Sequence, residues 1–417
     1  MSNSLNVNKF GIVTAFILLI FIPNEVYWSI SGVRLEPYRI FLLFVFIIYL
    51  PKIIGFKYTK SEFFLLLYCV WVAISFMRNH GFGSGLQSGV IHFLEVFVAF
   101  FLGMRIMGNV RSLKYNIGVF CVFFLILMPF AFVEATNGYR LFHALAASIT
   151  NVDYMPYLGE KYIRFGIHRS STVFSHPILY SITALMFLAL VFNLYKTRVA
   201  VVFSVGLVST IFTSVTSAAF LMFLINVFMF FLYRVSLKKE WIFKFSLIAL
   251  ILVLLFVEFM SNRGAVKFII DLTSFNSDTA YTRYIQWVHV MQNIDRSPIF
   301  GVGFSDWIRP FWMPPSVDSY WLLMTLRHGY VGVLLVSIFF ALTLRNYWLT
   351  YRATKDKIYY VFFVSIVSLV FAAFTVDLFD RAKPIVYFIL GMYNSFLVLE
   401  RVKIKKEKHE AKYIDAH

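Results

Sequence analysis

The stretch VAVVFSVGLVSTIFTSVTSAAFLMFLINVFMFFLY, residues 199–233, contains no charged side chain and lies between Arg198 and Arg234. A helix needs about 20 mostly apolar residues to cross a bilayer, so these 35 residues are too many for one crossing. The basic residues at both ends belong on the same side of a membrane, which requires an even number of crossings. We therefore predict two helices, divided at Thr213 to Ser217.

The composition of the whole chain agrees with a membrane protein. Of its 417 residues 60% are hydrophobic and only 14% are charged, and the mean hydropathy is +0.76. These values exclude disordered, collagen-like and disulfide-framed classes and argue against a soluble enzyme. Cys69 and Cys121 lie singly in apolar runs, which does not indicate a metal or redox pair. The net charge of +17 is scattered between apolar runs, so it does not indicate a nucleic-acid partner.

The apolar runs predict an all-α polytopic membrane protein that forms a single integral membrane domain over residues 1–417. Only helices and closed barrels can satisfy their backbone hydrogen bonds in lipid. About twelve runs are long enough, and we predict these transmembrane helices: 11–30, 39–55, 62–78, 88–107, 116–134, 176–194, 199–213, 217–233, 242–259, 320–343, 358–376 and 384–400.

The distribution of Lys and Arg sets the orientation. With both termini in the cytoplasm, more than half of the 38 Lys and Arg lie in short cytoplasmic segments, as the positive-inside rule requires. The first run resembles a secretory signal, but it continues through Trp28 without a cleavage context, so we predict a retained helix. Two long segments then remain on the outer side, residues 135–175 and 261–319, and such loops on a rigid helical scaffold commonly carry function.

The first outer loop, 135–175, and the residue that follows it are rich in basic side chains. Arginine binds phosphate oxygens through two parallel hydrogen bonds, so this cationic collar suits a diphosphate at the membrane surface. The alternative is contact with anionic lipid headgroups. The outer position of the collar weakens that alternative, because the positive-inside rule predicts few cations there. The collar contains Lys161, Arg164, His168, Arg169 and His176.

The second outer loop, 261–319, contains an amphipathic pattern and an aromatic cluster. Apolar residues recur at helical spacing from Ala280 to Met291, which predicts a helix lying on the membrane, with Arg283 in its first turns. Gly301 and Gly303 lack the strand-to-helix context of a nucleotide site and indicate a simple turn. The cluster that follows suits stacking on sugar rings and equally suits an interfacial aromatic belt. Its candidate sugar-binding residues are Trp307, Arg309, Trp312 and Tyr320.

Three further polar features of the sequence are Asp318, Glu95 and residues 377–383. Asp318 precedes an apolar helix and is a candidate for accepting a proton from an attacking hydroxyl, or for capping the helix N-terminus. Glu95 lies within a predicted span, where a carboxylate requires an ion pair or a water-filled lumen. Residues 377–383 contain four charges and predict a small surface turn whose charges pair with one another.

Several of these stretches resemble the O-antigen polymerase and ligase superfamily, polytopic glycosyltransferases that use polyprenyl-diphosphate-linked sugars. The specific part is TRYIQW (282–287), SPIFGVGF (297–304) and SVDSYWLLMTLRHGYVG (316–332), similar to the family's Arg-x-x-x-W, P-x-x-G-x-G and G-x-x-G segments. FGIHRSSTVFSHPILYS (165–181) and HFLEVFVAFFLGMRIM (92–107) resemble two further segments. The pattern is closer to the O-antigen and exopolysaccharide polymerase branch; the ligase branch commonly has a histidine in place of Asp318.

The resemblance implies an inverting transfer, independent of metal and cofactor, at the periplasmic face of a bacterial inner membrane. It implies catalytic roles for Arg283, Arg164 and Arg169, which would stabilise the departing diphosphate, and for Asp318 as proton acceptor, with His176 as a second choice. The expected donor and acceptor are both polyprenyl-diphosphate-linked glycans. Further expected partners are membrane lipid, a chain-length regulator and a flippase.

Two other functions stay open from the sequence. A ligase would transfer the glycan to a lipid A core or another acceptor. A lipid-linked oligosaccharide flippase or other transporter would suit twelve spans, but it would place charges along a central cavity within the spans. Most candidate cations lie instead in the outer loops.

Overall fold

The computed structural model of the protein describes residues 4–30, 32–106, 109–236 and 277–414, together with single positions between 252 and 271. Within this part of the chain, nine helices are long and apolar enough to cross a membrane. The protein is therefore a multi-pass helical membrane protein. The predicted span 242–259 and residues 261–266 and 272–276 of the second loop lie largely or wholly outside the described residues.

The elements of the described chain are nearly all helical, with two small antiparallel hairpins. In chain order they are α1 (Ser4–Ile20), β1 (Trp28–Ile30), β2 (Val33–Leu35), α2 (Pro37–Ile54), α3 (Lys60–His80), α4 (Phe82–Phe93), the π-helix η1 (Leu94–Val98), α5 (Ala99–Ile106), α6 (Val110–Asn137), α7 (Leu141–Thr150), the 3-10 helix η2 (Glu160–Tyr162), β3 (Ile163–Arg164), β4 (Ile167–His168), α8 (Pro177–Leu185), α9 (Leu188–Leu194), α10 (Thr197–Ser214), α11 (Ser217–Ser236), α14 (Ser277–Ile294), α15 (Tyr320–Thr354), α16 (Lys357–Ala372) and α17 (Ala382–Ile414).

Most predicted runs coincide with helices, and the division of the long apolar stretch is confirmed. Helix α10 ends at Ser214, Val215 adopts the left-handed conformation with φ 47°, and α11 begins at Ser217. The first run is the exception. Its helix ends at Ile20, and the chain then forms the β1–β2 hairpin, in which Trp28 pairs with Leu35. Pro23 explains the early end, because the residue before a proline is disfavoured in a helix.

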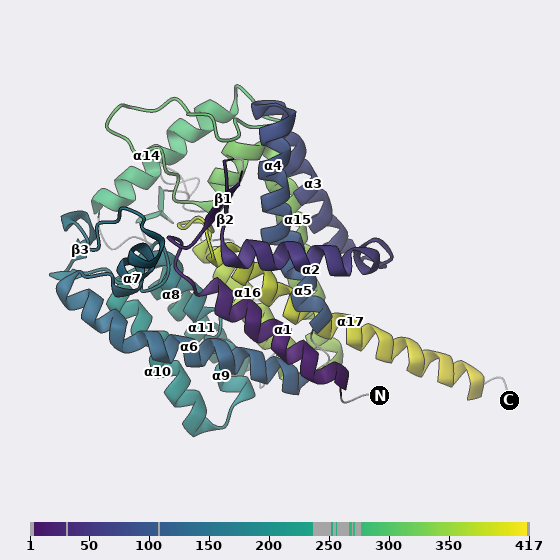
Figure 1. The fold of residues 1–417 in the computed structure, drawn as a ribbon. Helices are drawn as coiled ribbons and strands as arrows, with labels where there is room; N and C mark the ends of the chain where they lie inside the picture. The colour runs from purple at the N-terminus through teal and green to yellow at the C-terminus, as the bar shows by residue number, and fades with distance from the viewer. Residues whose placement is uncertain are drawn as a thin grey trace.

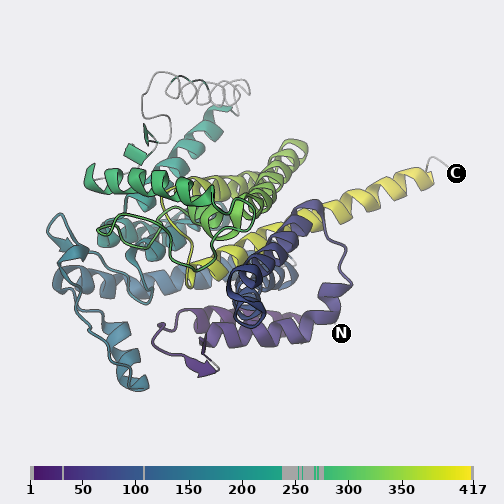
Figure 2. The ribbon, with the colours of Figure 1, turned by 90° about the horizontal axis from the view of Figure 1, so that it is seen from above.

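The helices pack so that the two termini lie at one end of the molecule and α7, β3 and α14 at the other (Figure 1). The C-terminal part of α17, which carries the basic tail, projects beyond the other helices in both views (Figure 1, Figure 2). Segments that the predicted alternation assigns to one side contact one another. These contacts are His143 Nδ1 with Glu25 at 2.9 Å, Ser170 N with Thr213 O at 2.8 Å, Tyr320 N with Ala373 O at 3.0 Å and Phe304 N with His80 Nε2 at 2.7 Å.

Helix α15 is broken at Gly329, and the glycine turn of the second loop fills the break. Gly329 has φ 70°, so the carbonyls before it leave the helical hydrogen-bond pattern. The backbone N–H of Val302 donates to Leu326 O (2.8 Å), and that of Gly303 donates to Arg327 O (3.0 Å). The turn 301–303, which we call the glycine strap, thus donates hydrogen bonds to the carbonyls left open by the break in α15.

We predict that Gly329→Ala destabilises the protein by roughly 3 kcal/mol, because a left-handed non-glycine residue is strained and a Cβ would lie 2.0 Å from Ile299 O. Thermal unfolding in detergent measures the change. Gly83→Ala is the matched control, since a Cβ there meets nothing within 4 Å. Equal unfolding temperatures for the two variants would refute the strap.

A network of buried charges joins the outer ends of α2 and α17 to the middle of the α4–η1–α5 helix. Glu95 lies in the π-helix and accepts hydrogen bonds from Arg39 Nε (2.9 Å), Tyr38 Oη (3.0 Å) and Lys383 Nζ (3.2 Å). The ion pair expected for a carboxylate within a span is therefore confirmed.

The predicted surface position of the turn at 377–383 is wrong, and its predicted self-pairing is confirmed only between Asp380 and Arg381. Arg381 is 0% exposed and binds Glu36 Oε2 at 3.2 Å and Asp380 Oδ2 at 3.5 Å. Its Nη1 also donates to Val173 O at 3.1 Å, in the segment before α8. Sequence spacing predicted only local pairing, but Arg381 has a second carboxylate partner in Glu36, the N-cap residue of α2. Burial of this charge requires such partners.

Candidate functional site

The first part of the site is the segment 169–175, which two buried side chains hold in place. Glu134, in the last turn of α6, accepts backbone N–H bonds from Ser171 and Thr172, both at 2.9 Å. Arg140 donates through Nη2 to Ser171 Oγ (2.7 Å) and Phe174 O (2.8 Å). Neither residue was predicted as a site residue from the sequence. A carboxylate that ends an apolar helix and an arginine shortly after it were the available signal.

Arg169 lies within this held segment and points a cationic group into the protein. Its backbone N–H donates to Tyr162 O (2.9 Å), and its Nε donates to Ser214 O (3.1 Å) at the end of α10. The side chain is only 5% exposed. Its Nη2 is buried and has no hydrogen-bond partner within the described part of the chain. A buried donor without a partner is costly, and a bound anion would supply one.

The second part of the site is α14, where the predicted helix is confirmed. Arg283 is 8% exposed, and its Nε lies 3.6 Å from Asp318 Oδ2. Gln286, one turn later, donates to Ser316 O (3.0 Å) and accepts from the backbone N–H of Asp318 (3.4 Å). One face of α14 therefore fixes the segment that carries Asp318.

The two parts meet, and the three arginines lie near enough to perturb one another. Burial, together with the charges of Arg164 and Arg283, lowers the pKa of Arg169 to about 9. Burial and Arg283 also lower the pKa of Arg164, and burial lowers that of Arg283, while Asp318 opposes these shifts. The four residues from distant parts of the chain thus form one cluster with an excess of positive charge. Mutual repulsion of this kind is relieved by an anion.

The histidines and Lys161 of the predicted collar contribute less. His176 caps α8, and its Nδ1 accepts from Ile178 N (3.3 Å). Burial, with Arg169, Arg140 and Arg164, lowers the pKa of His176 to about 3, so this histidine is neutral and the collar has one cation fewer than expected. His168 lies in β4, half-buried. Lys161 lies in η2, and its side chain is outside the described ones.

The aromatic cluster of the second loop divides into buried and exposed members. Trp307 is buried and donates to Pro315 O (3.0 Å), and Arg309 donates to Met313 O (3.0 Å) and pairs with Asp306. Tyr320 lies in the helical core, with its hydroxyl 3.0 Å from that of Tyr387. These side chains stabilise the loop and the helical core, so they are poor candidates for contacting a sugar. Trp312 is 54% exposed and stays a candidate.

The capping interpretation of Asp318 is wrong. Ser319 is the N-cap of α15, and its hydroxyl accepts from Leu322 N (3.4 Å). The side chain of Asp318 is 40% exposed and faces Arg283. It is therefore available to a ligand in the cluster.

Asp377 is a second carboxylate near the site. It lies in the connection between α16 and α17, and its Oδ1 is buried without a hydrogen-bond partner among the described residues. Burial, with a smaller effect of Asp318, raises the pKa of Asp377 to about 6, although the charges of Arg327 and Lys383 oppose this shift. The residue was assigned to a surface turn because sequence alone does not reveal that α15 and α17 enclose it.

The described residues contain no group of three or more His, Cys, Asp or Glu side chains that could hold a metal ion. Comparison of the sequence with protein-family models gave no match, and comparison with curated proteins gave none either.

Proposed function

We propose that the protein is an inverting, metal-independent membrane glycosyltransferase that polymerises polyprenyl-diphosphate-linked oligosaccharide repeat units of O-antigen or exopolysaccharide. The observation that carries the proposal is the cluster of Arg164, Arg169 and Arg283 beside Asp318. The resemblance of residues 282–332 to the polymerase and ligase superfamily supplies the substrate class.

The chemistry of the transfer explains the need for such a cluster. The acceptor hydroxyl attacks the anomeric carbon of the donor, and the bond from that carbon to the polyprenyl diphosphate breaks. Negative charge then develops on the leaving diphosphate, and fixed guanidinium groups stabilise it in a partly buried site. The spare Nη2 of Arg169 and the repulsion among the arginines both favour binding of this anion.

The proposed location of the site is the periplasmic face of a bacterial inner membrane, with both termini in the cytoplasm. The distribution of Lys and Arg supports this orientation. The donor and acceptor glycans would enter from the outer leaflet.

Two carboxylates are candidates for accepting the proton of the attacking hydroxyl. Asp318 faces the arginines and is paired with Arg283, whose Nε lies 3.6 Å away. Asp377 has an oxygen without a hydrogen-bond partner among the described residues and a pKa of about 6, close to the operating pH of a periplasmic enzyme. We propose that Asp377 accepts the proton and that Asp318 orients the acceptor.

We predict that the transfer rate depends on pH through Asp377. Only the ionised carboxylate accepts a proton, so the rate should fall as the pH drops through about 6. In Asp377→Asn the rate should be at least about a hundredfold lower and this pH step should be absent. The measurement is the initial rate of chain growth across pH. A wild-type pH profile in Asp377→Asn would assign the proton to Asp318, which Asp318→Asn then tests.

The transporter alternative finds less support in the charges within the bundle. Arg39 and Lys383 lie inside the bundle, but both bind Glu95, so their charges are paired within the protein. A reconstitution experiment separates the functions: purified protein receives lipid-linked repeat units in detergent, and the products are run on a gel. A ladder on the carrier supports the polymerase. Transfer only to lipid A core would identify a ligase, and lipid movement across proteoliposomes without a ladder would identify a transporter.

A further inference from the structure

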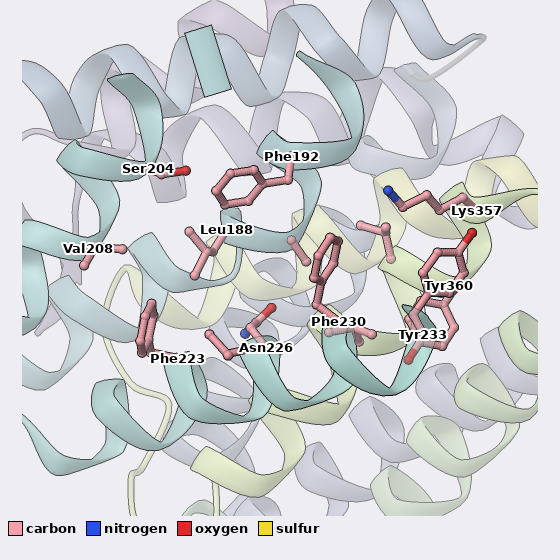
Figure 3. A pocket seen from close by; sticks show the side chains of 14 residues that line it. Leu188, Phe192, Ser204, Val208, Phe223, Asn226, Phe230, Tyr233, Lys357 and Tyr360 are labelled. Carbon is pink, nitrogen blue, oxygen red and sulfur yellow. The ribbon is translucent and has the colours of Figure 1, made fainter. Parts of the chain in front are cut away.

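A pocket of about 330 Å³ lies between α9, α10, α11 and α16, and none of the clustered arginines lines it. Its wall is apolar apart from Ser204, Asn226 and one end. The pocket is elongated, with Lys357, Tyr233 and Tyr360 at one end and Val208 and Phe223 at the other (Figure 3). Its volume falls within the range of ligand sites, which begins at about 300 Å³.

The rim of the pocket faces outward within the described part of the chain. Phe192 and Val227, which both line it, are 52% and 51% exposed, and Phe230 is also exposed. These side chains belong to apolar helices, so the surface beside them is in contact with bilayer hydrocarbon. A lipid chain could therefore enter the pocket sideways from the membrane.

One end of the pocket is cationic. Lys357 Nζ lies 5.6 Å from the ring centres of both Phe230 and Tyr233, and the guanidinium of Arg234 lies 5.3 Å from the ring of Phe230. Neither cation makes an ion pair with another described residue. The adjacent acidic residue, Asp356, caps α16 by accepting from Ile358 N (3.0 Å). Within the described residues, no carboxylate neutralises the two cations, and a bound anion would complement them.

We infer that this pocket binds an anionic phospholipid, with one acyl chain along the apolar walls and the headgroup phosphate at Lys357 and Arg234. Basic pockets between transmembrane helices on the cytoplasmic side bind anionic headgroups. The positive-inside pattern places the ends of α11 and α16 that carry these cations in the cytoplasm. A polyprenyl diphosphate fits less well, because its charged group would lie at the opposite face. The inference does not rest on the proposed transferase activity.

The test measures the lipid retained by the full-length protein. Wild type and variants are reconstituted in nanodiscs of phosphatidylcholine with a minor fraction of phosphatidylglycerol, re-extracted in detergent and analysed by mass spectrometry. Val227→Trp fills the rim and should lower the retained phosphatidylglycerol severalfold. Lys357→Gln should lose the preference for phosphatidylglycerol and retain the two lipids in proportion to their content in the nanodiscs. Val202→Trp is the matched control, because Val202 is exposed on α10 but does not line the pocket.

Three results would overturn the inference. Equal retention by Val227→Trp and Val202→Trp would mean that the lipid is only part of the general annulus. An unchanged preference for phosphatidylglycerol in Lys357→Gln would remove the headgroup assignment. Preferential retention of polyprenyl phosphate from mixed nanodiscs would show that the carrier occupies the pocket. An unchanged gel-filtration profile for each variant confirms that it is folded.

Discussion

Arg283→Lys is expected to lower the rate of polymer formation by at least about a hundredfold, although the positive charge is kept. The planar fork of arginine can bind a diphosphate through two parallel bonds while facing Asp318 Oδ2 at 3.6 Å, and the lysine ammonium cannot. The measurement is the length ladder of polysaccharide on a gel from cells with equal membrane levels of each protein.

Arg296→Lys is the matched control for this experiment, since Arg296 is exposed and follows the same helix. It should leave the ladder unchanged. Loss of the ladder in Arg283→Lys, with single repeat units still made and displayed, would support a role in the transfer step. An unchanged ladder would remove Arg283 from the site and leave Arg164 and Arg169 as the candidates for binding the diphosphate.

Glu95→Ala is expected to destabilise the protein by about 3–5 kcal/mol, because it removes the shared partner of two largely buried cations. Arg39 would keep the Arg34 carbonyl at 2.8 Å and the Glu36 carboxylate at 3.4 Å, and Lys383 would lose its 3.2 Å contact. Thermal unfolding in detergent and the yield of monodisperse protein report the loss. Glu95→Gln keeps a hydrogen-bond acceptor, so its stability should lie between that of the wild type and that of Glu95→Ala.

Glu160→Ala provides the comparison for the Glu95 variants, because Glu160 is exposed and makes no ion pair with the described residues. Its stability should match the wild type. If Glu95→Ala and Glu160→Ala unfolded at the same temperature, the buried network would not hold α2, α5 and α17 together.

The spans were largely predictable because the bilayer imposes a simple demand on the sequence. The divided stretch 199–233 and the amphipathic helix at 280–291 form helices near the predicted limits, and the run 320–343 begins as predicted but continues as a helix to Thr354. The first span was predicted too long, since apolar residues continue past Ile20 while Pro23 turns the chain. Hydropathy counts residues and does not see this local restriction.

The candidate site was predictable in part. The chemistry of arginine and aspartate selected Arg164, Arg169, Arg283 and Asp318, and the structure brings these four together. Tyr320 and Trp307 were selected by residue type alone, and both are buried. Arg140, Glu134 and Asp377 were not predicted as site residues, because only the folded structure shows which groups lie beside their side chains.

The amino-acid sequence alone thus determines where helices cross the membrane and where cations gather. The length of each apolar run and the placement of Lys and Arg between the runs can both be read directly from the chain. Packing alone defines which polar groups meet. Arg381 reaches Glu36, Glu95 reaches Lys383, and the glycine strap closes the break at Gly329. Such contacts join residues far apart in sequence, and a buried charge or an open backbone group must find its partner wherever the folded helices place one.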